Sequence, residues 1–287
     1  MSMHGIREMP TTWSCGRFQF DFTKRSRPIV MGILNATPDS FSDGGRYRTA
    51  KDAIAHAEHM LAGGVDLIDI GGESTRPGAV PVGLQEELDR VLPVIEALID
   101  CGVPLSIDTY KAETMRQALG AGVDCVNDIW ALRQEDSVEV IASDEKCGVI
   151  LMHMQRDPLT MQFNPEYQDV IAEVIQFLDE RAQLLISKGV DKKRIAIDPG
   201  FGFGKRLEHN LKMLSKFNAF TKLSFPVLAG ISRKSMIGRL TGKEADDRIA
   251  PSVAAVVMAA DRGAKIVRVH DVAETVDALK LWEAIQD

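Results

Sequence analysis

Eight short apolar runs recur along the chain, and a polar or charged residue ends each of them. The ends are Asn35, Asp69 with Glu73, Asp108, Asn127 with Asp128, His153, Asp198, Ser232 with Arg233 and Lys234, and Arg268 with His270. A parallel strand that is covered on both faces reads as a continuous aliphatic or β-branched run. The pattern therefore predicts eight buried strands that carry polar chemistry at one end.

Segments with apolar residues at helical spacing separate these runs. We expect helices over 50–61, 84–99, 109–119, 165–187, 207–220, 247–262 and 272–285, and a poorer helix over 136–145. Parallel neighbours need such crossovers, and eight strand–helix units in roughly 250 residues indicate a TIM (β/α)8 barrel. An open doubly wound sheet is the alternative, but its first strand should lead into a dinucleotide fingerprint, where this chain has NATPDSFSDGG.

The domain organisation follows from the same pattern. No linker or break in composition divides the chain, so we expect one domain over residues 1–287. Residues 1–27 precede the first unit, and the alternating run FQFDF predicts a short N-terminal β extension, a hairpin packed on the bottom of the barrel. The connections over 36–48, 74–83 and 235–246 are polar or rich in glycine, which makes them candidate lids at the top face.

Composition excludes several classes of function. The net charge is −7 and no basic stripe is present, so we expect no nucleic-acid partner. The four cysteines form no CxxC pair, which is typical of buried thiols in a reducing cytoplasm. The N-terminus lacks a long apolar segment, and no stretch approaches the roughly 18 apolar residues of a membrane span. We therefore expect a cytoplasmic protein without a membrane partner.

Four carboxylates end different strands and should converge on one barrel mouth. They are Asp69, Asp108, Asp128 and Asp198. Either they form a metal cage, or they recognise a flat, donor-rich heterocycle, because a carboxylate accepts two parallel N–H bonds from an amidine edge. The competing interpretation is that some of them cap the following helices, and it weighs most for Asp69. We do not count Asp69 among the catalytic candidates.

Cations end the last two strands. Many barrels bind phosphate in the loops after strands seven and eight, where Lys234, Arg268 and His270 lie. Arg268 and His270 are two residues apart, so strand alternation points them to the same side. His153, between two methionines, favours a core histidine with one satisfied nitrogen.

The segment DPGFGFGK, residues 198–205, is the densest motif. Its three glycines permit a tight backbone near a ligand. Phe201 and Phe203 are candidates to present aromatic faces to that ligand.

The motifs GILNATPDSFSDGG, DIGGESTRPGA, SIDT, NDI, LMHM, DPGFGFGK, SRKS and RVHD follow one another along the chain. Together they resemble the dihydropteroate synthase family, from about Pro28 to Glu283. The resemblance implies a transferase of folate biosynthesis. It would condense 6-hydroxymethyl-7,8-dihydropterin pyrophosphate with p-aminobenzoate to give 7,8-dihydropteroate and pyrophosphate. It also implies Mg²⁺ as cofactor, a homodimer, and inhibition by sulfonamides, since nothing interrupts DPGFGFGK.

The resemblance also implies roles for individual residues. The pterin would be bound by Asp108, Asn127, Met152, Asp198, Lys234 and Arg268. The pyrophosphate would be bound by Asn35, Arg268 and His270, with Asn35 as the Mg²⁺ ligand. The aminobenzoate would be bound by Phe41, Thr75, Arg76, Pro77, Phe203, Lys234 and Ser235. Asp43, Asp108, Lys234 and Arg268 would be catalytic, in an SN1-like route in which Asp43 and Asp108 stabilise a cation on the pterin methylene.

Three other functions remain open at this point. A pterin-binding methyltransferase uses a similar barrel, a Schiff-base aldolase would use Lys234 as its nucleophile, and a non-catalytic protein would only bind a pterin. Tyr110 and Ala112 depart from what the family leads us to expect, and Trp130 belongs either to the rim of the pterin pocket or to an outward face. The apolar, small-residue helix over 250–260 is either core or interface, and we favour the interface.

Overall fold

The computed structural model describes residues 10–37, 50–74, 80–156, 160–161 and 163–286. Its main sheet has eight parallel strands: β3 (Ile29–Asn35), β4 (Leu67–Gly71), β5 (Leu105–Asp108), β6 (Cys125–Asp128), β7 (Gly148–Met152), β8 (Ile195–Asp198), β9 (Leu228–Ala229) and β10 (Ile266–Val269). They are ordered β8-β7-β6-β5-β4-β3-β10-β9. A bridge between Ile197 of β8 and Val227 before β9 brings the two edges together. The sheet therefore curls into a nearly closed barrel, and the predicted TIM fold is confirmed.

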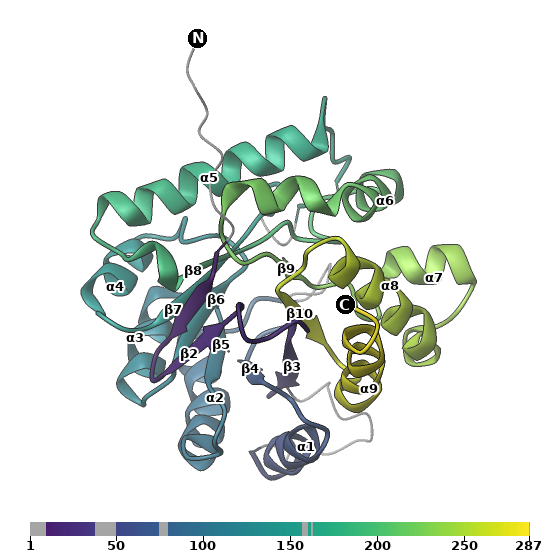
Figure 1. Ribbon diagram of the computed structural model, residues 1–287. Helices are drawn as coiled ribbons and strands as arrows, with labels where there is room; N and C mark the ends of the chain where they lie inside the picture. The colour runs from purple at the N-terminus through teal and green to yellow at the C-terminus, as the bar shows by residue number, and fades with distance from the viewer. Residues whose placement is uncertain (1–9, 38–49, 75–79, 157–159, 162, 287) are drawn as a thin grey trace.

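Helices follow the strands and surround the barrel (Figure 1). They are α1 (Ala50–Ala62), α2 (Leu84–Leu98), α3 (Ala112–Gly120), α4 (Ser137–Ser143), α5 (Val170–Ser187), α6 (Leu207–Ser215), α7 (Ser235–Thr241), α8 (Ile249–Asp261) and α9 (Val272–Glu283). Short 3₁₀ turns are η2 (Lys192–Arg194), η3 (Phe217–Leu223) and η4 (Ala245–Asp247). None of the helices in the described ranges is long and apolar enough to cross a membrane.

Two helices begin later than predicted, because polar side chains form turns ahead of them. The helix expected from residue 109 begins at Ala112, after the Thr109 Oγ1 accepts the Lys111 N–H at 3.2 Å. The helix expected from residue 165 begins after Asp169, whose carboxylate accepts the Ile171 N–H at 3.1 Å and caps the first turn.

Two further segments have a different secondary structure from the one predicted. The helix expected over 207–220 divides into α6 and η3, and residues 235–246, expected as a lid, fold as α7 and η4. Gly242 ends α7 in a left-handed conformation with φ of 70°. The described part of this connection is therefore regular structure rather than an open loop.

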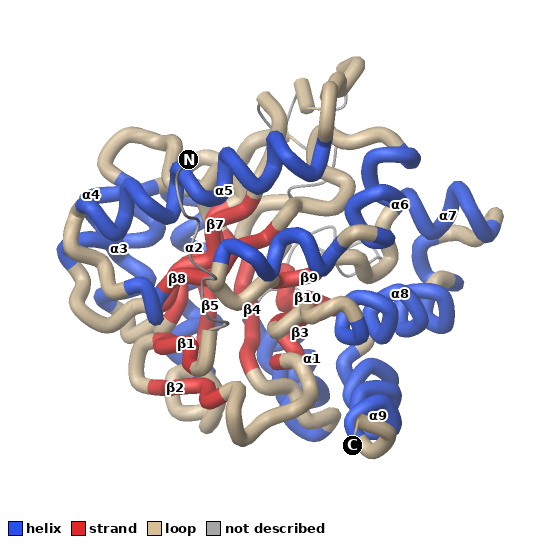
Figure 2. Tube along the Cα trace, turned by 45° about the horizontal axis from the view of Figure 1, so that its top comes forward, coloured by secondary structure: helices blue, strands red, loops and turns tan. Residues whose placement is uncertain are grey.

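An antiparallel hairpin of β1 (Thr12–Cys15) and β2 (Phe18–Asp21) lies against the amino-terminal end of the barrel. Trp13 is fully buried, and its Nε1 donates to the Arg194 carbonyl at 3.1 Å. Figure 2 shows the hairpin next to β8. Trp13 and Cys15 pack in one cluster with Ile29, Met31, Leu67, Cys125, Ile150, Ala196, Leu228 and Ile266. Seven of the eight barrel strands, all but β5, contribute to this apolar layer, which the hairpin covers.

The strand register aligns the polar ends at the other side of the barrel. Asn35 pairs with Gly71, Gly71 with Asp108, and Asp108 with Asn127. Met152 likewise pairs with Asp198. Because the strands are parallel, these residues meet at one rim, where parallel barrels carry their active sites.

Candidate active site

Arg268 lies at the centre of the barrel mouth. Its Nε donates to Asp69 Oδ2 at 2.6 Å, and its Nη2 donates to Asp108 Oδ2 at 2.6 Å. Asn127 Nδ2 donates to the same Asp69 oxygen at 3.0 Å. Side chains from β4, β5, β6 and β10 thus form one buried, charge-assisted network.

The carboxylates of this network are not fully satisfied. Oδ1 of Asp69 and Oδ1 of Asp108 are buried and have no hydrogen-bond partner among the described residues. Burial raises the pKa of Asp108 to about 7, against the lowering effect of Arg268 and with a further rise from Asp69. A buried acceptor without a donor is unfavourable, so the Asp108 oxygen is well suited to accept an N–H from a bound ring.

Asp198 and Lys234 form the opposite side of the mouth. Asp198 ends β8, and its Oδ1 accepts the Gly200 N–H at 2.7 Å. Burial raises the pKa of Asp198, while the nearby Lys234 ammonium opposes that rise. Burial lowers the pKa of Lys234 to about 8, and Asp198 opposes that shift. A carboxylate and an ammonium therefore face the same space with both charges partly desolvated.

Lys234 is held by the loop that follows β8. Its Nζ donates to the Phe201 carbonyl and lies 4.4 Å from the centre of the Phe203 ring. Phe203 is half-buried at this rim, as a ligand-facing ring should be. Phe201 is not, because its ring is fully buried and stacks on Phe217 at 6.2 Å in the core. The expectation that Phe201 presents its face to a ligand is wrong.

An apolar wall lies between the two charged sides. Met152 packs with Ile129, Met154 and Met161, and the cluster is bordered by Tyr110, Trp130 and Phe203. Trp130 stacks on Tyr110, with ring centroids 5.1 Å apart. Trp130 therefore belongs to the rim beside Met152, which decides the question that the sequence left open.

The remaining predicted groups of the described chain lie at the end of β3 and in the segments that follow β9 and β10. His270 Nδ1 is 3.1 Å from Ser232 Oγ, and this oxygen also accepts the His270 backbone N–H at 3.2 Å. Asn35 is half-buried at the end of β3, and Ser235 is exposed at the start of α7. Arg233, by contrast, is paired with Asp271 and does not join the mouth.

Not every predicted residue can be placed. Phe41, Asp43, Thr75, Arg76 and Pro77 lie outside the described residues. Their proposed roles stay predictions.

Asp69 and Asp128 differ in whether the carboxylate binds the following backbone or faces the barrel mouth. Asp128 accepts the backbone N–H groups of Trp130 and Leu132, both at 2.7 Å, and so fixes the turn after β6. Asp69 Oδ2 instead accepts from Arg268 and Asn127, so this carboxylate belongs to the buried network at the mouth, although the sequence left it out of the catalytic candidates. Its inward direction follows from alternation with Leu67, which faces the barrel interior.

Two further groups, to which the sequence assigned no role, support the site. Glu73 accepts the Tyr110 hydroxyl at 2.8 Å and binds Lys111, which fixes the chain after β4 against the chain after β5. Lys205 is buried and contacts His153, whose Nδ1 lies 3.0 Å from its Nζ. His153 is a core histidine, as expected, and its edge packs on Phe177 at 5.0 Å.

A magnesium ion at this rim would need only a small number of protein ligands. In the described ranges, no group of three or more His, Cys, Asp or Glu residues could hold a metal. Mg²⁺ bound together with a substrate phosphate needs only one or two protein oxygens and keeps several waters. Asn35 Oδ1 and Asp108 Oδ2 both lie within 4 Å of the position that a Cβ on Gly71 would take. The rim therefore fits a hydrated cation held through Asn35.

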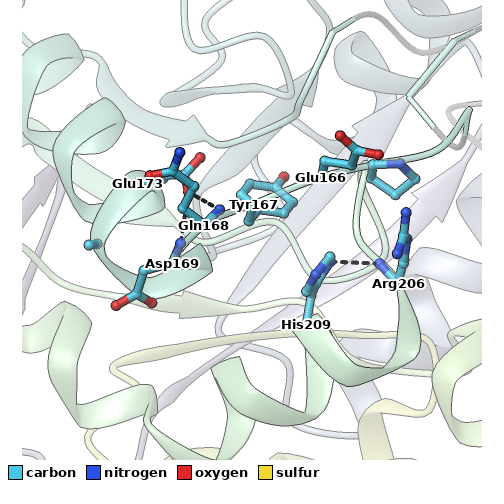
Figure 3. Close-up of a pocket in the computed structure, with 9 residues that line it drawn as sticks. Glu166, Tyr167, Gln168, Asp169, Glu173, Arg206 and His209 are labelled. Atoms are coloured by element: carbon cyan, nitrogen blue, oxygen red, sulfur yellow. Dashed lines mark hydrogen bonds between the residues drawn. The ribbon is translucent and has the colours of Figure 1, made fainter.

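A separate cavity of about 740 Å³ lies between the starts of α5 and α6 (Figure 3). Its polar groups largely satisfy one another. Glu173 accepts the Gln168 and Asp169 N–H groups at 2.7 and 2.9 Å, and His209 Nδ1 accepts the Arg206 N–H at 3.2 Å. The charged strand ends do not line it, so it is not the candidate active site.

Comparison with known proteins agrees with this geometry. A family model described as Pterin binding enzyme matches residues 31–270. The dihydropteroate synthase of Neisseria meningitidis serogroup C is 50% identical over 277 residues, which cover 95% of this chain and 97% of that protein. The chain belongs to the dihydropteroate synthase family. It is therefore an enzyme, and the methyltransferase, aldolase and non-catalytic alternatives are set aside.

Solved dihydropteroate synthases share the fold over nearly the whole chain. The Burkholderia cenocepacia enzyme complexed with 7,8-dihydropteroate is 49% identical, with a TM-score of 0.88 over 97% of this chain and 98% of that one. The Yersinia pestis enzyme with a sulfonamide drug complex is 45% identical, with a TM-score of 0.90 over 95% and 98% of the two chains.

Proposed function

We propose that this protein condenses 6-hydroxymethyl-7,8-dihydropterin pyrophosphate with p-aminobenzoate, and releases 7,8-dihydropteroate and pyrophosphate in folate biosynthesis. The observation that carries the proposal is the mouth itself. Asp108, Asn127, Asp198 and Lys234 supply acceptors and donors at one rim of the barrel, where Met152 pairs with Asp198 in the strand register. The Burkholderia cenocepacia relative binds 7,8-dihydropteroate, the product of this reaction.

The pterin is recognised by its hydrogen-bonding edges. The Asp198 carboxylate accepts two N–H bonds from the amino-pyrimidine edge, which matches a two-pronged acceptor. Asp108 and Asn127 bind other ring nitrogens, and the otherwise unpaired Asp108 Oδ1 gains a donor. Lys234 donates to the oxygen or ring-nitrogen edge. Met152 supplies the apolar surface against the ring.

The aminobenzoate lies beside the pterin, above Phe203. In the described chain, Phe203, Lys234 and Ser235 contribute to its pocket. Phe41, Thr75, Arg76 and Pro77 complete the pocket from the two loops after β3 and β4. A sulfonamide competes for the same position, in keeping with the sulfonamide complex of the Yersinia pestis relative.

The pyrophosphate leaves on the side of β3 and β10. Asn35, His270 and Arg268 bind it there. Arg268 uses Nε and Nη2 for Asp69 and Asp108, and its Nη1 makes no hydrogen bond to the described residues. This edge can therefore donate to a phosphate oxygen without breaking the network. Mg²⁺, when bound through Asn35, neutralises the developing negative charge.

The chemical step is SN1-like in this proposal. The bond between the pterin methylene and the pyrophosphate oxygen breaks first, and its electron pair leaves with pyrophosphate. Asp108 and Asp43 stabilise the methylene cation, while Arg268, His270 and Asn35 stabilise the departing anion. The arylamine nitrogen then attacks the methylene and loses a proton to solvent. Closure of the loops excludes water, which would otherwise capture the cation.

The test is direct. The purified protein, both substrates and Mg²⁺ are combined, and 7,8-dihydropteroate is followed by mass spectrometry. We expect product that disappears when either substrate is omitted, and competition between a sulfonamide and p-aminobenzoate. Pterin binding without product would reject the synthase activity.

Assembly and location are part of the same proposal. The outward face of α8 carries Ala250, Ala254 and Met258, and Met258 is 50% exposed. Leu240 of α7 is 58% exposed. We place a homodimer contact on this apolar face, in a cytoplasmic enzyme. Sedimentation velocity of the wild type and of Met258→Glu tests it, because a monomeric wild type contradicts the dimer.

A further inference from the structure

The loop between β8 and α6 is pressed onto the chain that leaves β7. Gly200, Gly202 and Gly204 have φ of +73°, +80° and +61°, a region that glycine adopts without strain. A Cβ on Gly200 would lie 2.0 Å from the His153 carbonyl oxygen, and one on Gly204 would lie 2.9 Å from Gln155 Cβ. No other side chain fits here, so the loop follows the β7 end closely.

A buried lysine occupies the space enclosed by this loop. Lys205 is 4% exposed, and its Nζ donates to the carbonyls of His153 at 3.2 Å, Gly200 at 2.9 Å and Phe203 at 3.0 Å. With His153 Nδ1 at 3.0 Å, these carbonyls place four acceptors around the three protons of an ammonium group, so one proton is shared. No carboxylate hydrogen-bonds this group in the described part of the chain. Burying a charged group in this way is costly unless the group is fully hydrogen-bonded.

We propose that Lys205 is a positioning residue that fixes the β8–α6 loop and thereby orients Lys234 and Phe203 for the aminobenzoate. Two of the carbonyls that bind Lys205, those of Gly200 and Phe203, come before and after Phe201 in the chain. The Phe201 carbonyl between them accepts a hydrogen bond from Lys234, and the Phe203 ring lies beneath the same ammonium. Lys205 touches neither substrate in this arrangement and acts through the loop. The inference rests on the proposed function.

Neighbouring groups keep His153 neutral and act in opposite directions on Lys205. Burial and the Lys205 charge both lower the pKa of His153, so its Nδ1 can accept a hydrogen bond from the ammonium. Burial lowers the pKa of Lys205, and Asp198 opposes that shift. Lys234 and Arg133 are the other charged groups that act on this pair.

The loop is also tied from its outer side. The Tyr167 hydroxyl donates to the Gly204 carbonyl at 2.8 Å, and Asn210 Oδ1 accepts the Gly202 N–H at 2.8 Å. Tyr167 lines the cavity between α5 and α6 (Figure 3). These two hydrogen bonds hold Gly202 and Gly204. Gly200 is instead held by Lys205, which donates to its carbonyl, and by Asp198, which accepts its N–H. Tyr167→Phe therefore offers a milder change of the same loop.

The experiment compares Lys205→Met, Lys205→Arg and Tyr167→Phe with Lys216→Met, an exposed lysine at the end of α6. In Lys205→Met we expect the KM for p-aminobenzoate to rise about 10-fold to 100-fold, since small misplacements of positioning groups are that costly. The affinity for the pterin pyrophosphate should fall by less than the KM for p-aminobenzoate rises, because Lys234 also contacts the pterin but Asp108 and Asn127 are not touched. Lys205→Arg should recover part of the loss, and Lys216→Met should match the wild type.

Hydrogen exchange of residues 199–204 supplies a readout that does not depend on turnover. Faster exchange in Lys205→Met, with unchanged exchange in the hairpin over 12–21, supports the positioning role. A folded Lys205→Met with wild-type KM for both substrates, or with equal losses for both, overturns it. If Lys205→Met does not fold, Tyr167→Phe decides, because a wild-type KM for p-aminobenzoate together with unchanged exchange overturns the role. A wild type that makes no dihydropteroate rejects the proposed function instead.

Discussion

The two ends of the barrel are built from the same strands but have opposite chemistry. At the bottom, inward residues such as Ile266, Cys125 and Ala196 pack around Trp13 in a layer of mainly apolar side chains. Two residues further along the same strands, the inward positions are Arg268, Asn127 and Asp198. Strand alternation keeps each pair on one side, so the change is one of composition and not of direction. One end therefore provides stability, and the other concentrates charges that need partners.

The difference lies in how completely the buried groups are satisfied. At the bottom, the Trp13 indole N–H has a carbonyl partner. At the mouth, Asp69 and Asp108 each keep a buried oxygen without a partner in the described chain, and their charge depends on Arg268. Substitutions at the bottom should thus change stability with little effect on substrate binding. Substitutions at the mouth should change both.

Arg268→Met should have the largest effect. It leaves two buried carboxylates without their cation, which typically costs about 3–5 kcal/mol of unfolding free energy. It should also lower the rate of product formation by about 10³-fold or more, since one cation contacts both the pterin side and the leaving group. Urea unfolding and single-turnover kinetics measure the two effects.

The control is Arg116→Met, which removes an exposed arginine whose carboxylate partner in the described chain is Glu113 on α3. Its unfolding free energy should stay within about 0.5 kcal/mol of the wild type. Full activity in Arg268→Met would show that the network is structural alone.

Trp13→Ala tests the bottom of the barrel. Removing this fully buried ring should cost about 3–5 kcal/mol of unfolding free energy. The KM for both substrates should stay at the wild-type value at a temperature where the variant is folded. Thermal unfolding and steady-state kinetics provide the comparison, and a change in KM without a loss of stability would contradict the division between the two ends.

The substitutions Asp108→Asn and Asp43→Asn test whether these carboxylates take part in the chemical step. If these carboxylates stabilise a methylene cation, each variant should slow single turnover by about 10²-fold. Pterin affinity is measured separately by titration, which isolates ground-state binding from the rate. Wild-type single-turnover rates in both variants would remove the cation-stabilising role.

The stability of the mouth should depend on pH in a defined direction. The folded pKa of Asp108 is about 7, above the ordinary value of 3.8, so the folded state retains a proton that the unfolded state loses. This contribution is fully present below about pH 4 and is lost as the pH rises through 7. The stability of Asp108→Asn relative to the wild type should therefore increase by about 2–3 kcal/mol between pH 5 and 8. Urea unfolding at both pH values checks it, and an unchanged difference would show that Asp108 keeps an ordinary pKa.

Much of the fold was predictable, because hydrophobic periodicity reflects burial directly. The helices α1 and α2 lie where apolar spacing predicted them, and the polar strand ends meet at one rim as parallel neighbours must. The start of α5 was missed because Asp169, rather than the apolar pattern, sets the first turn. The connection over 235–246, expected as a loop, folds largely as α7 and η4, because polarity and glycine do not distinguish a loop from a short exposed helix.

The sequence predicted most residues of the candidate site, but not which of their side chains contact one another. Asp69 was set aside because a carboxylate after a strand can equally cap a helix, and only the position of Arg268, 199 residues away, decides between the two. Phe201 and Phe203 are two residues apart in one glycine-rich motif. The left-handed glycines of that loop turn one ring into the core and leave the other at the rim.

The strand–helix alternation, the eight polar strand ends and the motifs of the family can be read from the chain, because they depend on neighbours in sequence. That Arg268 binds both Asp69 and Asp108, and that Lys205 has three carbonyls among its partners, is visible in the folded molecule alone. Such partners are brought together by closure of the barrel and by the backbone path of one loop. Their distances, and the burial that shifts their pKa values, follow from three-dimensional packing and are not encoded in local spacing.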